Sequence, residues 1–216
     1  MQLKYLVYSP MPRASHKPHS PSLAGDPAAL LNAELEEHRV TFEATAKCLS
    51  PQFLRTLEIL ETGLRRGGKV MLFGNGGSAA DAQHIGAELI IRYKADRPPI
   101  AAIALTTDSS AITACGNDLG FDALFERQIA GLGREHDVAV GISTSGKSPN
   151  VIRGLRQAKL MGLQTVGLTG GTGGEFPGAC DASIVVPSAV TARIQEMHIM
   201  IGHVWCKVLE QRLGLV

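Results

Sequence analysis

At 216 residues, the chain is long enough for one domain with a well-buried core and too short for two large ones. Its 21 Lys and Arg residues balance its 20 Asp and Glu residues, so no strong field favours nucleic acid or an anionic membrane as the partner, and a small ligand is the first expectation. The four cysteines form no C-x-x-C pair, which argues against a zinc ribbon and against a disulfide framework.

The first part of the chain, residues 1–25, contains a short apolar patch followed by Pro, Ser, His and Arg. It has neither the long apolar core nor the small-residue cleavage site of a signal peptide. No apolar run in the chain approaches the ~18 residues of a membrane-spanning helix. We therefore expect a cytoplasmic protein with a flexible N-terminal extension over residues 1–25 and a single domain over residues 26–216.

A helical pattern begins at Asp26, which offers a cap and is followed by Pro at the first helical position and by many good helix formers. A second set of start and stop signals follows, with Ser50, Pro51 and a terminal Gly pair at residues 67–68. These signals predict two helices before the first strand.

Five short apolar runs bounded by turn residues come next, each typical of a strand that is buried on both faces: KVMLFG, IAAIAL, DVAVGI, QTVGLT and ASIVVP. Helical patterns lie between and after them, at residues 79–93, 122–132, 148–161 and 192–213. The alternation predicts an α/β fold, a three-layer α/β/α sandwich with a five-stranded parallel sheet and N-terminal helices. The segment TGGTGGE, residues 169–175, is interpreted as a loop without assigned chemistry.

Three of the predicted strands end in unusual loops, and ligands of open parallel sheets bind beyond the carboxyl ends of the strands. The loops are GNGGSAADAQH, TTDSS and STSGKSPN. The last combines backbone amides at a helix start with four hydroxyls, those of Ser143, Thr144, Ser145 and Ser148. This combination suits the oxygens of a phosphate group, although Ser and Thr also serve as simple helix caps.

The same loop satisfies the nucleotide-binding pattern G-x-x-x-x-G-K-[ST] from Gly141 to Ser148. A nucleotide hydrolase also needs a strand that ends in an Asp for magnesium, and the nearest candidate, Asp108, lies three residues past its strand. Pro149 restricts the backbone beside Ser148, and the hydroxyls suit a single phosphate better than a triphosphate. We interpret the match as coincidental; nucleotide binding that depends on magnesium and Lys147 would support the alternative.

The helix after GNGGS carries His84 and Glu88, four residues apart and on one face. From spacing alone, an ordinary helix contact is the simpler interpretation. The Gly-rich loop at the start of this helix favours a polar site instead, as do Gln195, His198 and His203 in an otherwise apolar late helix.

Four segments taken together, GNGGSAADAQH with its following Glu, GNDLGF, GISTSGKSPNV and ARIQEMHIMIGH, resemble in order the motifs of the phosphoheptose isomerases of the sugar isomerase (SIS) superfamily. The similarity covers about residues 30–213. It implies an SIS, flavodoxin-like fold and an isomerase that converts sedoheptulose 7-phosphate to D-glycero-D-manno-heptose 7-phosphate through an enediol. It also implies a homotetramer with interfacial active sites, a role in heptose precursors of bacterial surface glycans such as lipopolysaccharide, and, in several members, zinc.

The resemblance also implies roles for single residues. Glu88 matches the catalytic base of the family and His203 its proton-transferring histidine, while His198 matches a histidine without a catalytic role and is expected to be structural. The positions that match zinc ligands are His84, Glu88, Gln195 and His203. The positions that match phosphate or sugar contacts are Ser143, Thr144, Ser145, Ser148, Asn75, Ser78, Asp108 and Gln195.

From the residues alone, the case for zinc is weaker. H-x-x-x-E is a usable half-site, but Gln is an uncommon ligand. Gln195 and His203 lie eight residues apart, which is roughly 12 Å along a straight helix. Joint ligation would therefore need long reach or help from another subunit.

Two questions stay open at this point: which sugar phosphate is the substrate, and whether the protein is an enzyme or a non-catalytic binding protein. Some family members have Asp three residues before the Gln, where this chain has Ala192 after Thr191, so one sugar contact and the sugar itself are in question. A related non-catalytic SIS protein binds the replication initiator and lacks the equivalents of Glu88 and His203, both of which are present here. Other sugar-phosphate isomerases would share the hydroxyl loop but not the histidine and carboxylate pattern.

Overall fold

One sheet of five parallel strands organises the domain, in the order β2-β1-β3-β4-β5. The strands are β1 (Val70–Gly74), β2 (Ala102–Ala104), β3 (Val138–Ser143), β4 (Gln164–Gly170) and β5 (Ala182–Val186). Each coincides to within two residues with an apolar run of the sequence. Because β1 pairs with β3, the loops that follow these two strands lie side by side at the carboxyl edge.

The computed structural model describes residues 26–216, and the extension expected over residues 1–25 lies outside the described residues. The chain divides into two units between Glu36 and Glu37. The first unit contributes the beginning of helix α1 (Pro27–Arg65), where Leu30, Leu31 and Leu35 are exposed. The second unit contains the rest of α1 and every later element. Within residues 26–216, none of the helices is long and apolar enough to cross a membrane.

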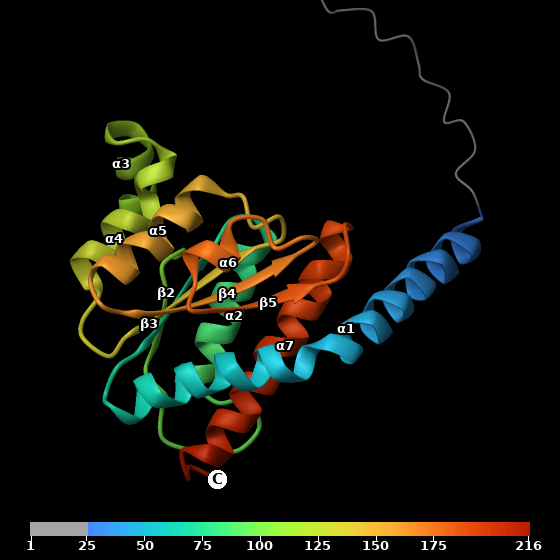
Figure 1. The fold of residues 1–216 in the computed structure, drawn as a ribbon, viewed down its shortest axis with the longest axis horizontal. Coiled ribbons are helices and arrows are strands. Elements are labelled where there is room, and N and C mark those ends of the chain that lie inside the picture. The colour runs from blue at the N-terminus through green and yellow to red at the C-terminus, as the bar shows by residue number, and fades with distance from the viewer. Residues whose placement is uncertain (1–25) are drawn as a thin grey trace, which may run out of the picture. The chain divides into compact units, whose positions relative to one another are not determined.

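Helices cover both faces of the sheet in the second unit (Figure 1). Successive residues of β1 point to opposite faces, so Leu72 joins a core with Leu60 and Trp205, while Phe73 joins another with Phe125. The first core lies against α2 (Gly77–Ile90), α7 (Thr191–Arg212) and the later part of α1. The second core lies against η1 (Phe121–Ala123), α4 (Leu124–Leu132), α5 (Pro149–Leu160) and α6 (Phe176–Ala179). The predicted three-layer α/β/α fold is confirmed.

The prediction of two helices before the first strand is wrong, because α1 runs without a break from Pro27 to Arg65 with Pro51 inside it. Proline removes one helical hydrogen bond, at a cost of about 3 kcal/mol in an isolated helix. Here the turns after Pro51 bury Leu57 and Leu60 in the core. Tertiary packing therefore outweighs the local stop signal.

Two helices occur where no helix was predicted. The helix α3 (Ser109–Asp118) begins at the first Ser of the TTDSS loop, and α6 lies just after the Gly-rich segment. Thr, Ile, Cys and Gly in α3 are weak helix formers, so its sequence gives little helical signal.

Candidate active site

The loop between β3 and α5 gathers the predicted phosphate-binding hydroxyls. Ser143 ends β3 and Ser148 is the N-cap residue of α5, and their Oγ atoms lie 2.9 Å apart. The Ser145 hydroxyl accepts a 3.2 Å hydrogen bond from the backbone N–H of Lys147. Hydroxyl groups and a helix N-terminus together form a suitable cradle for a dianionic phosphate.

A polar hollow of about 210 Å³ adjoins this loop. Thr144, Ser145 and Lys147 line one side, and the loops after β4 and β5 line the other with the hydroxyls of Thr172 and Ser188. Lys147 is exposed where it borders this hollow.

The glycine-rich segment after β4 supports the phosphate loop from behind. Gly146 has a φ of 62°, and a Cβ atom there would collide with the carbonyl oxygen of Gly173. The carbonyl oxygen of Gly146 accepts a 2.9 Å hydrogen bond from the N–H of Glu175. The segment that carried no predicted chemistry thus has a structural role, and Gly at position 146 permits the close approach.

A reciprocal amide pair joins the loop after β1 to the start of α5. The Asn75 Nδ2 donates to Asn150 Oδ1 at 2.8 Å, and Asn150 Nδ2 donates to Asn75 Oδ1 at 2.9 Å. Asn150 is only 1% exposed, and its Oδ1 also accepts from the N–H of Val151. The predicted sugar contact Asn75 is therefore engaged in a link between two loops, and Asn150 is a residue that the sequence motifs did not reveal.

Three of the predicted catalytic and metal-binding side chains meet where α2 packs on α7. The Nε2 atoms of His84 and His203 lie 2.9 Å apart, and Glu88 Oε1 lies 3.6 Å from His84 Nε2. Gly202 permits this contact between the helices, since a Cβ atom there would lie 2.5 Å from Cδ1 of Ile85. The imidazole of His84 is half exposed, so the cluster opens outward.

Gln195 lies at a different level of the same helix pair. Its side-chain amide packs so closely on Gly77 that a Cβ atom there would collide with it. Gly77 precedes His84 by seven residues, or roughly 10 Å along α2. The four predicted zinc-ligand positions therefore do not gather at one point, and within residues 26–216 no group of three or more His, Cys, Asp or Glu is arranged to hold a metal ion.

The remaining predicted residues serve the local structure. Asp108 is the N-cap residue of α3 and accepts a 2.9 Å hydrogen bond from the N–H of Ala111. Ser78 is buried in the first turn of α2. His198 is fully buried with its Nε2 atom 3.1 Å from the carbonyl oxygen of Thr169, and burial lowers its pKa to about 4. A neutral, buried His198 agrees with the expected structural role.

Two further side chains border the histidine pair without having been predicted. The Tyr93 ring stacks on His203 with centroids 5.4 Å apart and planes 28° apart. Asp81 lies one helical turn before His84, and burial raises its pKa to about 6, against a smaller opposing effect of His84. Within the described part of the chain, Asp81 Oδ2 is buried without a hydrogen-bond partner. The spacing of three residues to His84 was the one sequence signal for Asp81.

Comparisons with known proteins identify the family. The SIS domain family matches residues 35–170. A phosphoheptose isomerase of Paramagnetospirillum magneticum is 50% identical over 183 residues, which cover 85% of this chain and 95% of that protein. The family match and this relative identify the chain as a sugar-phosphate isomerase of the SIS class.

Solved structures narrow the class further. The phosphoheptose isomerase of Neisseria gonorrhoeae superimposes with a TM-score of 0.80 at 40% identity, covering 85% of this chain and 98% of that one. The enzyme of Francisella tularensis superimposes with a TM-score of 0.83 at 36% identity, covering 87% and 100%. The chain belongs to the phosphoheptose isomerase family.

The amide pair gives a prediction for substrate binding. Asn150→Ala removes two hydrogen bonds that fix the phosphate loop against the loop after β1, each worth about 1 kcal/mol. We expect KM for a sugar phosphate to rise about tenfold, with kcat changed less than threefold. Steady-state kinetics on the folded variant measure both constants, and an unchanged KM would contradict a positioning role for the pair.

Asp81 gives a prediction for stability against pH. Because its folded-state pKa of about 6 lies above the usual 3.8, the stability associated with the protonated form is present below pH 4 and is lost as the pH rises through 6. We expect Asp81→Asn to raise the free energy of unfolding at pH 8 by about 1–2 kcal/mol, allowing for partial exposure, with the difference shrinking at pH 4. Urea unfolding of chelator-treated protein at both pH values tests this; a pH-independent difference would contradict the assignment.

Proposed function

We propose that the chain interconverts sedoheptulose 7-phosphate and D-glycero-D-manno-heptose 7-phosphate, with Glu88 as the base that moves the proton between C2 and C1. The observation that carries the proposal is the meeting of Glu88, His84 and His203 on two helices of a domain that also presents a hydroxyl-lined phosphate loop. Family membership supports the same reaction.

The reaction needs little beyond these groups. A ketose becomes an aldose when a proton leaves C1 and returns at C2 while the two neighbouring oxygens exchange a proton. The phosphate loop holds the far end of the substrate, so the reacting carbons are presented in a fixed orientation. The Glu88 carboxylate removes and returns the carbon-bound proton, and the His203 imidazole donates to and accepts from the oxygens.

We propose in addition that zinc binds at His84, Glu88 and His203. Two imidazole nitrogens and a carboxylate oxygen are donors that zinc prefers. The Nε2 atoms of His84 and His203 lie 2.9 Å apart and Glu88 Oε1 lies 3.6 Å from His84 Nε2, so these side chains would have to rearrange around a bound ion. Gln195 packs on Gly77, away from His84. It would become the fourth zinc ligand only if α7 shifted along its axis or if a second copy of the chain supplied the glutamine. When bound, the metal would polarise the substrate oxygens.

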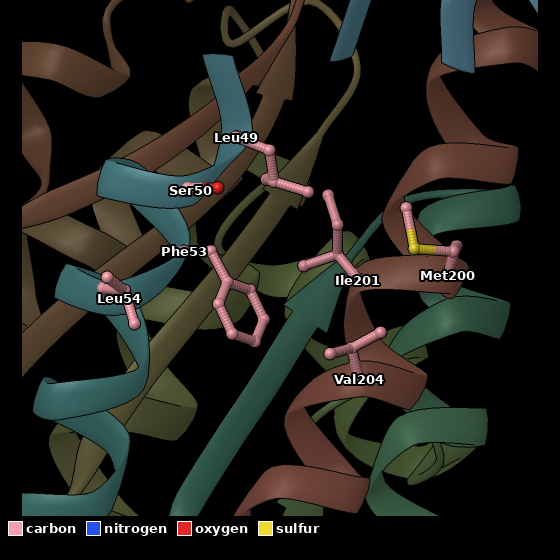
Figure 2. A pocket seen from close by; sticks show the side chains of 7 residues that line it. All are labelled: Leu49, Ser50, Phe53, Leu54, Met200, Ile201 and Val204. Atoms are coloured by element: carbon pink, nitrogen blue, oxygen red, sulfur yellow. The ribbon is translucent and has the colours of Figure 1, made fainter. Parts of the chain in front are cut away.

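We propose a homotetramer with active sites between subunits. An apolar groove of about 270 Å³ lies between α1 and α7, and Figure 2 shows its lining side chains, Leu49, Ser50, Phe53, Leu54, Met200, Ile201 and Val204. Leu54 is 56% exposed, which is costly for a surface that stays in water. Val204 and His203 lie in the same turn of α7, so a second copy that covers this groove would pack on the helix that carries His203. The cytoplasmic location and the use of the product in surface glycans stay predictions from the sequence.

The identity of the product tests the function. Purified protein is incubated with sedoheptulose 7-phosphate, once after chelation and once with added zinc, and proton NMR follows the anomeric signals of the aldose. We expect the manno-configured heptose 7-phosphate to form, faster with zinc. Absence of product from both samples of a folded tetramer would contradict the proposed substrate, and equal rates would contradict the proposed metal.

A further inference from the structure

A buried ion pair lies close to the histidine pair but touches neither imidazole. Arg97 Nε donates to Glu210 Oε1 at 2.8 Å, and the two side chains are 0% and 3% exposed. The arginine belongs to the segment between α2 and β2, and the glutamate to the last turns of α7. A fully buried pair is no strong source of stability compared with apolar residues of the same size, so its position calls for another explanation.

The guanidinium of Arg97 also closes the end of the helix that carries Glu88. Its Nη2 donates to the carbonyl oxygen of Glu88 at 2.9 Å, and its Nη1 donates to the carbonyl oxygens of Leu89 and Pro98 at 2.8 and 2.9 Å. The last carbonyl groups of a helix have no partners within the helix. Arg97 supplies those partners and thereby fixes the backbone of Glu88 itself.

The carboxylate of Glu210 fixes the other half of the cluster. Besides Arg97, its Oε1 accepts a 3.1 Å hydrogen bond from the backbone N–H of Tyr93. The Tyr93 ring in turn stacks on the imidazole of His203. Glu210 lies seven residues after His203, which is two turns along α7. The Glu210 carboxylate therefore links Tyr93 to the helix that carries His203.

We propose that Arg97, Glu210 and Tyr93 are positioning residues, which hold Glu88 and His203 in their reacting geometry by locking the end of α2 and the Tyr93 ring onto α7. This inference rests on the proposed function for the catalytic roles of Glu88 and His203. None of the three is proposed to contact the substrate. Their effect is on orientation, and a shift of about 1 Å at a reacting group lowers a rate by up to 100-fold.

Two variants test the proposal by separate routes. Glu210→Gln keeps the shape of the side chain and an acceptor oxygen but removes the charge opposite Arg97. Tyr93→Leu removes the ring that stacks on His203 and leaves the Arg97–Glu210 ion pair intact. This variant can therefore test the proposal even if Glu210→Gln does not fold. For each folded variant, we expect kcat on sedoheptulose 7-phosphate to fall at least about tenfold, with KM within threefold of the native value.

A matched control separates positioning from stability. Asp137 is also buried and paired, with its carboxylate 2.6 Å from Lys69 Nζ, but it lies at the amino edge of β3. Asp137→Asn should lower the unfolding midpoint as Glu210→Gln does, while kcat stays within twofold. A kcat loss in Glu210→Gln no larger than in Asp137→Asn, or native kcat in Tyr93→Leu, would overturn the proposal.

A second readout does not depend on turnover. Proton–nitrogen NMR of the imidazoles, recorded without substrate, should show the His203 signals displaced in Glu210→Gln and Tyr93→Leu and unchanged in Asp137→Asn. Native His203 signals in the first two variants would overturn the positioning role. If the native protein fails to turn over the substrate while these signals move as expected, the proposed function fails and the positioning network stands.

Discussion

Glu88→Gln is expected to lower kcat by three orders of magnitude or more, to the limit of detection. The amide keeps the size of the carboxylate but is not basic, so no group remains to remove the proton from the carbon, and general base catalysis alone is worth about 10²–10⁴ in rate. The side chain is partly exposed, so the fold should tolerate the change. Steady-state assays over a range of enzyme concentrations measure the loss.

The phosphate loop provides the control for this variant. None of its hydroxyls is bonded to Glu88, so binding of the substrate, measured by calorimetry on the inactive protein, should stay within about threefold of the native affinity. Glu88→Asp, which retains a shorter carboxylate, should recover part of the rate. Turnover in Glu88→Gln at more than a tenth of the native kcat would contradict the assignment of the base.

His203→Gln is expected to reduce kcat by about two to four orders of magnitude. The amide occupies much of the space of the imidazole, but it cannot both give and take a proton at neutral pH, which is the property that makes histidine suited to proton relay. KM should change far less than kcat, because the phosphate is held elsewhere. A rate loss below tenfold would contradict a role for His203 in proton transfer.

A second histidine variant controls for surface effects. His136 lies two residues before β3, outside the histidine pair and its described contacts, and has a φ of 71°. Asn tolerates this left-handed conformation better than most residues, so His136→Asn should fold normally and keep the native kcat. Equal losses in the His136 and His203 variants would show that the assay reports damage to the fold.

Local sequence signals were enough to predict the five strands and the hydroxyl residues of the loop after β3. The five apolar runs became the five strands because strands buried on both faces have a continuous apolar signature. Ser143 and Ser148 met at the start of α5 because a parallel strand followed by a helix places them there. Gln195 and His203, eight residues apart on α7, contact different parts of α2, the first at Gly77 and the second at His84.

Features that depend on distant residues were not predictable from spacing. Asn75 and Asn150 are 75 residues apart, and Arg97 and Glu210 are 113 apart, so no local pattern connects either pair. The continuous α1 was missed for a related reason, since Pro51 is a stop signal that only packing of the following turns on the sheet overrides. Helix and strand propensities depend on neighbouring residues in the sequence, whereas these contacts form only when distant segments pack together in the folded domain.

The most direct test of the account is isotope exchange during turnover in heavy water. Native protein and Glu88→Gln are incubated separately with sedoheptulose 7-phosphate in D₂O, and proton and deuterium NMR follow the hydrogen at C2 of the aldose and at C1 of the remaining ketose. An enediol route with Glu88 as base predicts deuterium at both carbons with the native protein and at neither with the variant. Aldose that forms without deuterium, or exchange that persists in Glu88→Gln, would contradict the central claim.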